Sequence, residues 1–163
     1  MDRIFSVGGL VSLDSIPRTR KVVSVSNTLA MKKSLVPSGI DTKTNYETPD
    51  GQRPTLSTFM MWMARLRNIP MATIWAQIPY YLASIDDPHA WRLILDFLDK
   101  ELNLTLSMER IDKETEDYDS RIADARSTIP EFNSLLGRIE ASELLSPEDS
   151  EKLVDFIEEA LGY

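Results

Sequence analysis

The fold of this chain is decided by residues 71–81, whose sequence is MATIWAQIPYY. Residues 71–78 are apolar on both alternating sides, as a strand buried in the centre of a sheet requires. Pro79 closes this strand, because proline has no N–H to donate to a sheet. Tyr80 and Tyr81 follow at the carboxyl end of the strand, where open α/β folds place ligands. Two interpretations stay open: the tyrosines contact a ligand or an oligomer partner, or their rings pack over the sheet edge.

Two further strands are predicted nearer the N-terminus, over residues 3–7 and 20–26. The first ends at Gly8-Gly9, which predicts a strand-end turn with positive φ. The pair lacks the third glycine of a dinucleotide fingerprint and the Gly-Lys-Ser/Thr of a phosphate-binding loop. A structural turn is therefore favoured over a phosphate site.

A helix over residues 54–67 leads into the central strand, with Pro54 in its first turn. The succession of strand, helix and strand is typical of a βαβ unit, so an α/β fold with a parallel or mixed sheet is expected. Residues 59–63, FMMWM, are apolar nearly all round, and core burial accounts for most of this run. Because methionine-rich surfaces are also pliable contact surfaces, Met60 and Met63 are candidate contacts.

The chain after residue 86 is predicted to be helical, with helices over residues 88–102, 108–127, 130–141 and 148–161. We expect an α/β core over residues 1–105 and an acidic helical extension over residues 106–163.

The charge is divided unevenly along the 163 residues, whose net charge is -8. Residues 1–95 carry 11 Lys/Arg against 7 Asp/Glu, whereas residues 96–163 carry 7 against 19. The acidic balance argues against nucleic acid as a partner. No apolar stretch reaches the roughly 18 residues of a membrane span, and no cysteine is present, so a cytoplasmic protein away from membranes is expected.

Residue chemistry indicates no catalytic centre. His89 is the one histidine, which with no cysteine disfavours zinc, and it is expected to have a surface or capping role. No Gly-x-Ser-x-Gly elbow accompanies the serines. Arg18, Arg20 and Lys21 form a basic loop that could bind an anion, but such loops are common. We expect no metal and no cofactor.

Three pieces in shared order resemble the C-terminal part of the proteasome assembly chaperone family, the group with archaeal and actinobacterial homologues. They are IPRTR at residues 16–20, where relatives tend to have Pro-His-Thr-Arg, the Trp-x-x-x-Pro-x-Tyr pattern of residues 75–81, and the acidic Glu-Asp-Tyr-Asp around Tyr118. The resemblance covers nearly the whole chain.

The resemblance implies a three-layer α/β/α fold like that of nucleoside phosphorylases, with a C-terminal helical extension. Family members are usually longer, so the resemblance also implies a sheet that is incomplete at its N-terminal side. Several relatives end in a hydrophobic-Tyr-any motif that docks into pockets of the proteasome α-ring. This chain instead ends in Leu161-Gly162-Tyr163, with tyrosine last.

The function expected from the resemblance is that of a non-enzymatic protein-binding module acting through oligomeric surfaces. Its partners would be further copies of itself and proteasome α-subunits. The candidate contact residues are Arg18, Arg20, Met60, Met63, Tyr80, Tyr81, Tyr118 and Tyr163. The alternative is a phosphorylase-like or nucleotide-dependent ligase enzyme, with a small-molecule pocket at the strand ends lined by Gly8-Gly9, Arg18, Arg20 and Tyr80.

Overall fold

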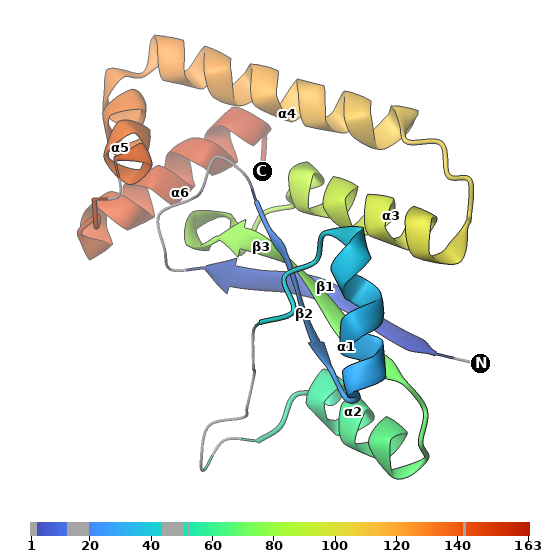
Figure 1. Ribbon diagram of the computed structural model, residues 1–163. Helices are drawn as coiled ribbons and strands as arrows, with labels where there is room; N and C mark the ends of the chain where they lie inside the picture. Colours follow the sequence, from blue (N-terminus) through green and yellow to red (C-terminus); the bar gives the residue numbers. More distant parts are fainter. Residues whose placement is uncertain (1–2, 13–19, 44–50, 52, 142) are drawn as a thin grey trace. The chain divides into compact units, whose positions relative to one another are not determined.

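The chain forms a mixed three-stranded sheet with helices, in a computed structural model that describes residues 3–12, 20–43, 51, 53–141 and 143–163. The strand order is β1-β3-β2, with bounds β1 Ile4–Ser12, β2 Val22–Ser26 and β3 Met71–Pro79. The central position predicted for residues 71–78 and the α/β fold class are therefore confirmed (Figure 1).

Of the two sheet types expected, the mixed one is present. β2 pairs antiparallel with β3, and the register places Val22 opposite Ala76 and Ser26 opposite Ala72. The helix predicted over residues 54–67, which leads into β3, is therefore not the crossover of a parallel βαβ unit. On the other side of β3, β1 runs parallel to it (Figure 1), and the Ile4 N–H donates to the Pro70 carbonyl at 2.9 Å where both strands begin.

The glycine pair lies inside a strand and not in a turn. β1 continues through Gly8 and Gly9 to Ser12, and neither glycine has a positive φ. The predicted strand-end turn is therefore wrong. A Cβ built on Gly8 would lie 3.5 Å from Cδ1 of Trp75 on the neighbouring strand. The glycine therefore packs next to an aromatic side chain.

Capping residues set the bounds of the helices around the sheet. Thr28 accepts from the Met31 N–H and begins α1, Leu29–Leu35, which continues into the 3-10 helix η1, Val36–Ser38. Thr55 accepts from the Thr58 N–H and begins α2, Leu56–Leu66. Pro54 therefore precedes this helix, since its N-cap is Thr55, whose hydroxyl accepts from the N–H of the third helical residue.

The predicted C-terminal helices are confirmed with small shifts of their ends. They are α3 Pro88–Leu102, α4 Glu109–Thr128, α5 Pro130–Glu140 and α6 Pro147–Leu161, preceded by the 3-10 helix η2 Tyr80–Leu82. Ser146 caps α6 through the Asp149 N–H, and Gly162 ends this helix with a φ of 81°.

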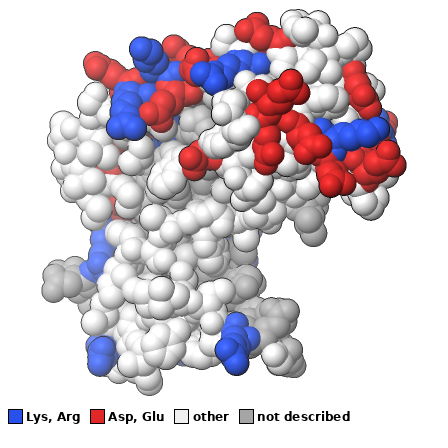
Figure 2. Space-filling view, turned by 180° about the vertical axis from the view of Figure 1, so that it is seen from behind, with Lys and Arg blue, Asp and Glu red and all other residues white. Residues whose placement is uncertain are grey.

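Two compact units divide the chain, and both are discontinuous in sequence. Unit 1 contains residues 1–10, 21–77 and 93–104; unit 2 contains residues 11–20, 78–92 and 105–163. Acidic side chains gather over α4, α5 and α6 of unit 2 (Figure 2). A domain boundary between residues 105 and 106 stays a prediction.

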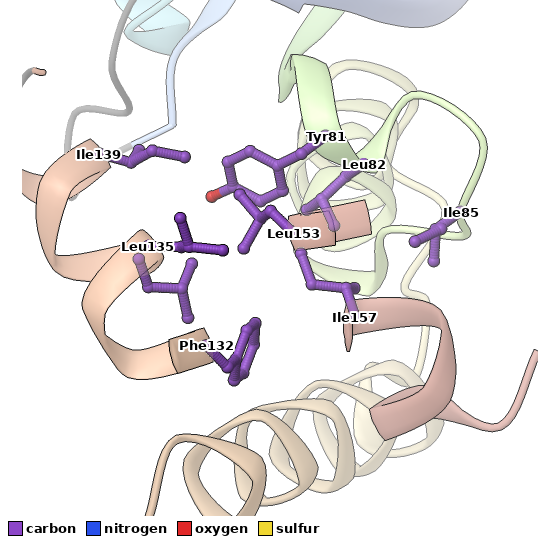
Figure 3. Packing of buried hydrophobic residues seen from close by; sticks show 9 residues of the cluster. Tyr81, Leu82, Ile85, Phe132, Leu135, Ile139, Leu153 and Ile157 are labelled. Atoms are coloured by element: carbon purple, nitrogen blue, oxygen red, sulfur yellow. The ribbon is translucent and has the colours of Figure 1, made fainter. Parts of the chain in front are cut away.

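The core of unit 2 is an apolar cluster contributed by three helical segments and the loop after η2. α5 contributes Phe132, Leu135 and Ile139, and α6 contributes Leu153 and Ile157 (Figure 3). The side chains of Tyr81, Leu82 and Ile85 join them from the chain after β3. Burying this apolar face stabilises helices whose outer faces are strongly charged.

Candidate functional site

The two tyrosines after β3 lie in η2 and pack within unit 2. Tyr81 is buried, Tyr80 is half-buried, and their rings meet edge to face with centroids 5.5 Å apart. The Tyr80 hydroxyl lies 3.3 Å from Oγ of Ser150 on α6. Both tyrosines therefore hold η2 against the helical cluster, and a partner contact through either of them stays a prediction.

Arg20 forms an ion pair with Asp87, which precedes α3. The side chain of Asp87 is 1% exposed and that of Arg20 is 16% exposed, so water screens this pair poorly. The same carboxylate oxygen, Oδ1, accepts from the N–H groups of His89 at 3.1 Å and Ala90 at 3.3 Å. Asp87 thus caps α3, as its place before Pro88 indicates, and it also neutralises Arg20. The sequence did not indicate this ion pair.

Tyr81 and Tyr118 lie close enough to this ion pair for it to influence both phenols. Burial raises the pKa of Tyr81 and of Tyr118 above the ordinary value, since a phenolate inside the protein loses its hydration. The negative charge of Asp87 also raises both pKa values, and the positive charge of Arg20 lowers them; Arg20 has the larger effect of the two at Tyr81, and Asp87 has the larger effect at Tyr118. Both phenols are therefore protonated at neutral pH.

His89 extends this polar cluster to the surface. Its Nε2 lies 2.8 Å from Oδ1 of Asp119 on α4, and its ring meets the Tyr118 ring edge to face at 5.8 Å. The expected surface or capping role of His89 thus takes the form of a contact between α3 and α4. Oδ2 of Asp87 is buried and has no hydrogen-bond partner among the residues that the structure describes.

The structure gathers three of the sequence candidates, Arg20, Tyr81 and Tyr118, around Asp87. Arg18 lies outside the described residues, as do residues 13–17 and 19. Tyr163 is 67% exposed at the end of α6, where its N–H donates to the Glu158 carbonyl at 3.0 Å. Contact of these residues with a partner stays a prediction.

Met60 and Met63 lie on α2 in unit 1. The interpretation of residues 59–63 as core is wrong for Phe59, Met60 and Trp62, whose side chains are exposed. Met63 is half-buried. The apolar pattern predicted a helix face but could not show that this face points away from the sheet.

Among the described residues, no helix is both long and apolar enough to cross a membrane. Within the same residues, no cluster of three or more His, Cys, Asp or Glu side chains could hold a metal ion.

Comparison with solved structures finds the same fold in longer proteins. Pyrococcus furiosus PbaA, an archaeal homolog of proteasome-assembly chaperone, matches with a TM-score of 0.57 and 21% identity over 71% of this chain and 47% of its own. Pyrococcus furiosus PbaB, an archaeal proteasome activator, matches with a TM-score of 0.55 and 16% identity over 72% and 48%. A protein of unknown function from Mycobacterium tuberculosis matches with a TM-score of 0.62 and 15% identity over 97% and 47%.

This chain spans about half the length of the solved structures that it matches. No protein in the comparison with curated sequences matches it. The PAC2 family model matches residues 1–126, which include all three strands and most of α4. This chain therefore belongs to the PAC2 family.

Proposed function

We propose that this chain is a non-enzymatic protein-binding module related to the proteasome assembly chaperones, acting through oligomeric surfaces in the cytoplasm. Its partners are further copies of itself and proteasome α-subunits. PAC2 family membership over residues 1–126 carries this proposal. The likeness to PbaA, a homolog of proteasome-assembly chaperone, and to PbaB, a proteasome activator, supports the choice of the proteasome as partner.

The state of the polar groups around Asp87 and η2 also favours binding over catalysis. Arg20, which the alternative enzyme would use to hold an anion, is already neutralised by Asp87. The Tyr80 hydroxyl lies within hydrogen-bond distance of Ser150, and the raised pKa of Tyr81 keeps its phenol protonated. A base or nucleophile at neutral pH would need a pKa shifted in the opposite direction.

Co-purification with proteasome α-subunits from the source organism tests the proposal. We expect the tagged chain to capture α-subunits, and light scattering to give a mass of two or more chains. Tyr163→Ala is expected to weaken capture if the C-terminus contributes, while Leu144→Ala, at another exposed apolar side chain, serves as the matched control. Absence of α-subunits from the captured proteins would contradict the proposal.

A thermal-shift panel of nucleosides, phosphate and nucleotides separates the enzyme alternative from this proposal. A ligand at 100 times its dissociation constant stabilises the folded state by about 2.7 kcal/mol, which is easily seen as a raised midpoint. We expect no such rise, and a reproducible rise with one ligand class would favour an enzyme.

A further inference from the structure

Helix α2 presents its apolar side to solvent. On a helical projection, six apolar side chains form one continuous stripe, which we name the α2 face: Leu56, Phe59, Met60, Trp62, Met63 and Leu66. Five of these six are exposed, and Leu66 reaches 77% exposure. An amphipathic helix of a globular protein normally turns such a stripe toward the core, because burial of apolar area is its main source of stability.

The opposite side of α2 carries the contacts with the rest of unit 1. Ala64 is the buried residue of the helix, and Oγ of Ser57 lies 3.0 Å from Oγ of Ser6 on β1. Ala64 and Ser57 therefore lie toward the unit, Met61 and Met63 are half-buried, and the other large apolar side chains of α2 are exposed. An exposed apolar stripe of this size is typical of a surface that another polypeptide covers.

Among the residues that the structure describes in and next to α2, the charged ones are all positive. No Asp or Glu occurs anywhere in residues 51–85, whereas Arg53, Arg65 and Arg67 are all present and exposed. Within the described part of the chain, none of these three arginines forms an ion pair. A partner with carboxylates at its border would therefore gain attraction that an uncharged or basic partner would not.

A second copy of this chain supplies such a partner poorly. If two α2 faces met around a twofold axis, each arginine would approach like charges of the other copy. The acidic helices α5 and α6 of a second copy have carboxylates, but their apolar residues, such as Phe132, Leu153 and Ile157, are already buried in the core of unit 2. Neither arrangement satisfies the apolar and the charged parts of the face together.

We propose that the α2 face binds an acidic amphipathic helical segment of a different polypeptide, with apolar side chains on one side and Asp or Glu along its borders. This proposal rests on the protein-binding function above and names the chemistry of one partner segment. The apolar stripe supplies contact area in the helix-on-helix manner, and the bordering arginines select acidic sequences. Met60 and Met63 adapt their shape, so the face can accept more than one such sequence.

Fluorescence anisotropy of labelled peptides tests the proposal on the full chain. The probe is a helical peptide of about 15 residues, long enough to be marginally stable, with leucine at helical spacing and glutamate elsewhere. One control peptide replaces every glutamate by lysine, and a second replaces every leucine by serine. We expect the first peptide to bind, both controls to bind at least about tenfold more weakly, and added salt to weaken binding of the acidic probe.

Two substitutions on the surface of α2 and two matched controls locate the binding site. Leu66→Gln and the double variant Arg65→Glu/Arg67→Glu change exposed side chains, so neither is expected to prevent folding. Each is expected to weaken the acidic peptide by about tenfold or more, and the double variant should gain affinity for the lysine peptide. Leu144→Gln and Lys113→Glu change exposed residues of unit 2 and should leave binding unchanged.

Three results would overturn the inference: equal binding of the acidic and lysine peptides, no binding of the acidic peptide, or a dimer in light scattering that Leu66→Gln dissociates. The last would show that a second copy covers the face. Capture of α-subunits, measured in parallel, tests the proposed function separately. Capture without peptide binding would remove only the α2 proposal, and peptide binding without capture would remove only the proteasome partner.

Discussion

Replacing Asp87 by asparagine should destabilise unit 2 more than any comparable change at a surface ion pair. Asparagine keeps the size of the side chain and an oxygen that can still cap α3, so the main change is loss of the negative charge beside Arg20. The Arg20 side chain is only 16% exposed, so its guanidinium cannot recover full hydration without moving. It therefore stays charged in a poorly hydrated place with no counter-charge from Asp87.

The expected loss follows from the burial of the pair. Removing one partner of a buried ion pair costs about 3–5 kcal/mol, and because Arg20 retains some contact with water we expect about 3 kcal/mol for Asp87→Asn. For a chain of this size, each kcal/mol lowers the melting temperature by roughly 2–4 °C, so a fall of about 6–12 °C is expected. The double variant Arg20→Met/Asp87→Asn should lose less than the sum of the two single variants, because it leaves no charge unpaired.

Urea unfolding followed by circular dichroism measures these differences. Asp112→Asn is the matched control, since it removes one partner of the exposed Arg92–Asp112 pair and should cost less than about 1 kcal/mol. If the two units unfold in separate transitions, only that of unit 2 should move, because Arg20 and Asp87 both belong to it. A loss below about 1 kcal/mol for Asp87→Asn, or strictly additive single variants, would refute the reasoning.

Three further predictions concern titration, a strand glycine and a helix cap. Burial raises the pKa of Tyr81 and Tyr118 above 10, so the folded state keeps these protons to higher pH than the unfolded state does, and the free energy of unfolding should fall as pH rises above 10. Phenolate absorbance should show that both ionise at higher pH than exposed tyrosines. Ionisation of all tyrosines at the same pH would contradict this. Gly8→Ala should change the unfolding free energy by no more than about 1 kcal/mol, because its Cβ would make an ordinary 3.5 Å contact with Trp75; a loss of several kcal/mol in urea unfolding would show that the strand cannot accept it. Ser146→Ala should cost about 1 kcal/mol in the same assay by removing the cap on α6, whereas Ser146→Asp should retain stability; equal stability of both variants would argue against the cap.

Local features of the fold were predictable wherever neighbouring residues decide the conformation. The start of α6 follows from Ser146 and Pro147, and its end follows from Gly162, because caps act over three or four residues. The strand at residues 71–78 was equally clear, since a short run that is apolar on both sides is bounded by two prolines.

Features that depend on distant residues were not predictable in this way. Gly8 and Gly9 can adopt either turn or strand conformations, and pairing of β1 with β3 selects the strand. Arg20 looked like a free cation in a basic loop because its partner lies 67 positions later in the chain. The candidate cluster around Asp87 therefore became visible only after the chain had folded.

The sequence by itself determined the α/β class, the helices and the acidic character of the C-terminal part, because these follow from composition, capping and short-range periodicity. Only the tertiary structure decided which side of α2 faces the sheet, since periodicity fixes the width of an apolar stripe but not its direction. Most of the stripe is exposed because Ala64, which is buried, and Ser57, which contacts Ser6, lie on the side of α2 toward unit 1, and only Met61 and Met63 among the large apolar side chains are half-buried.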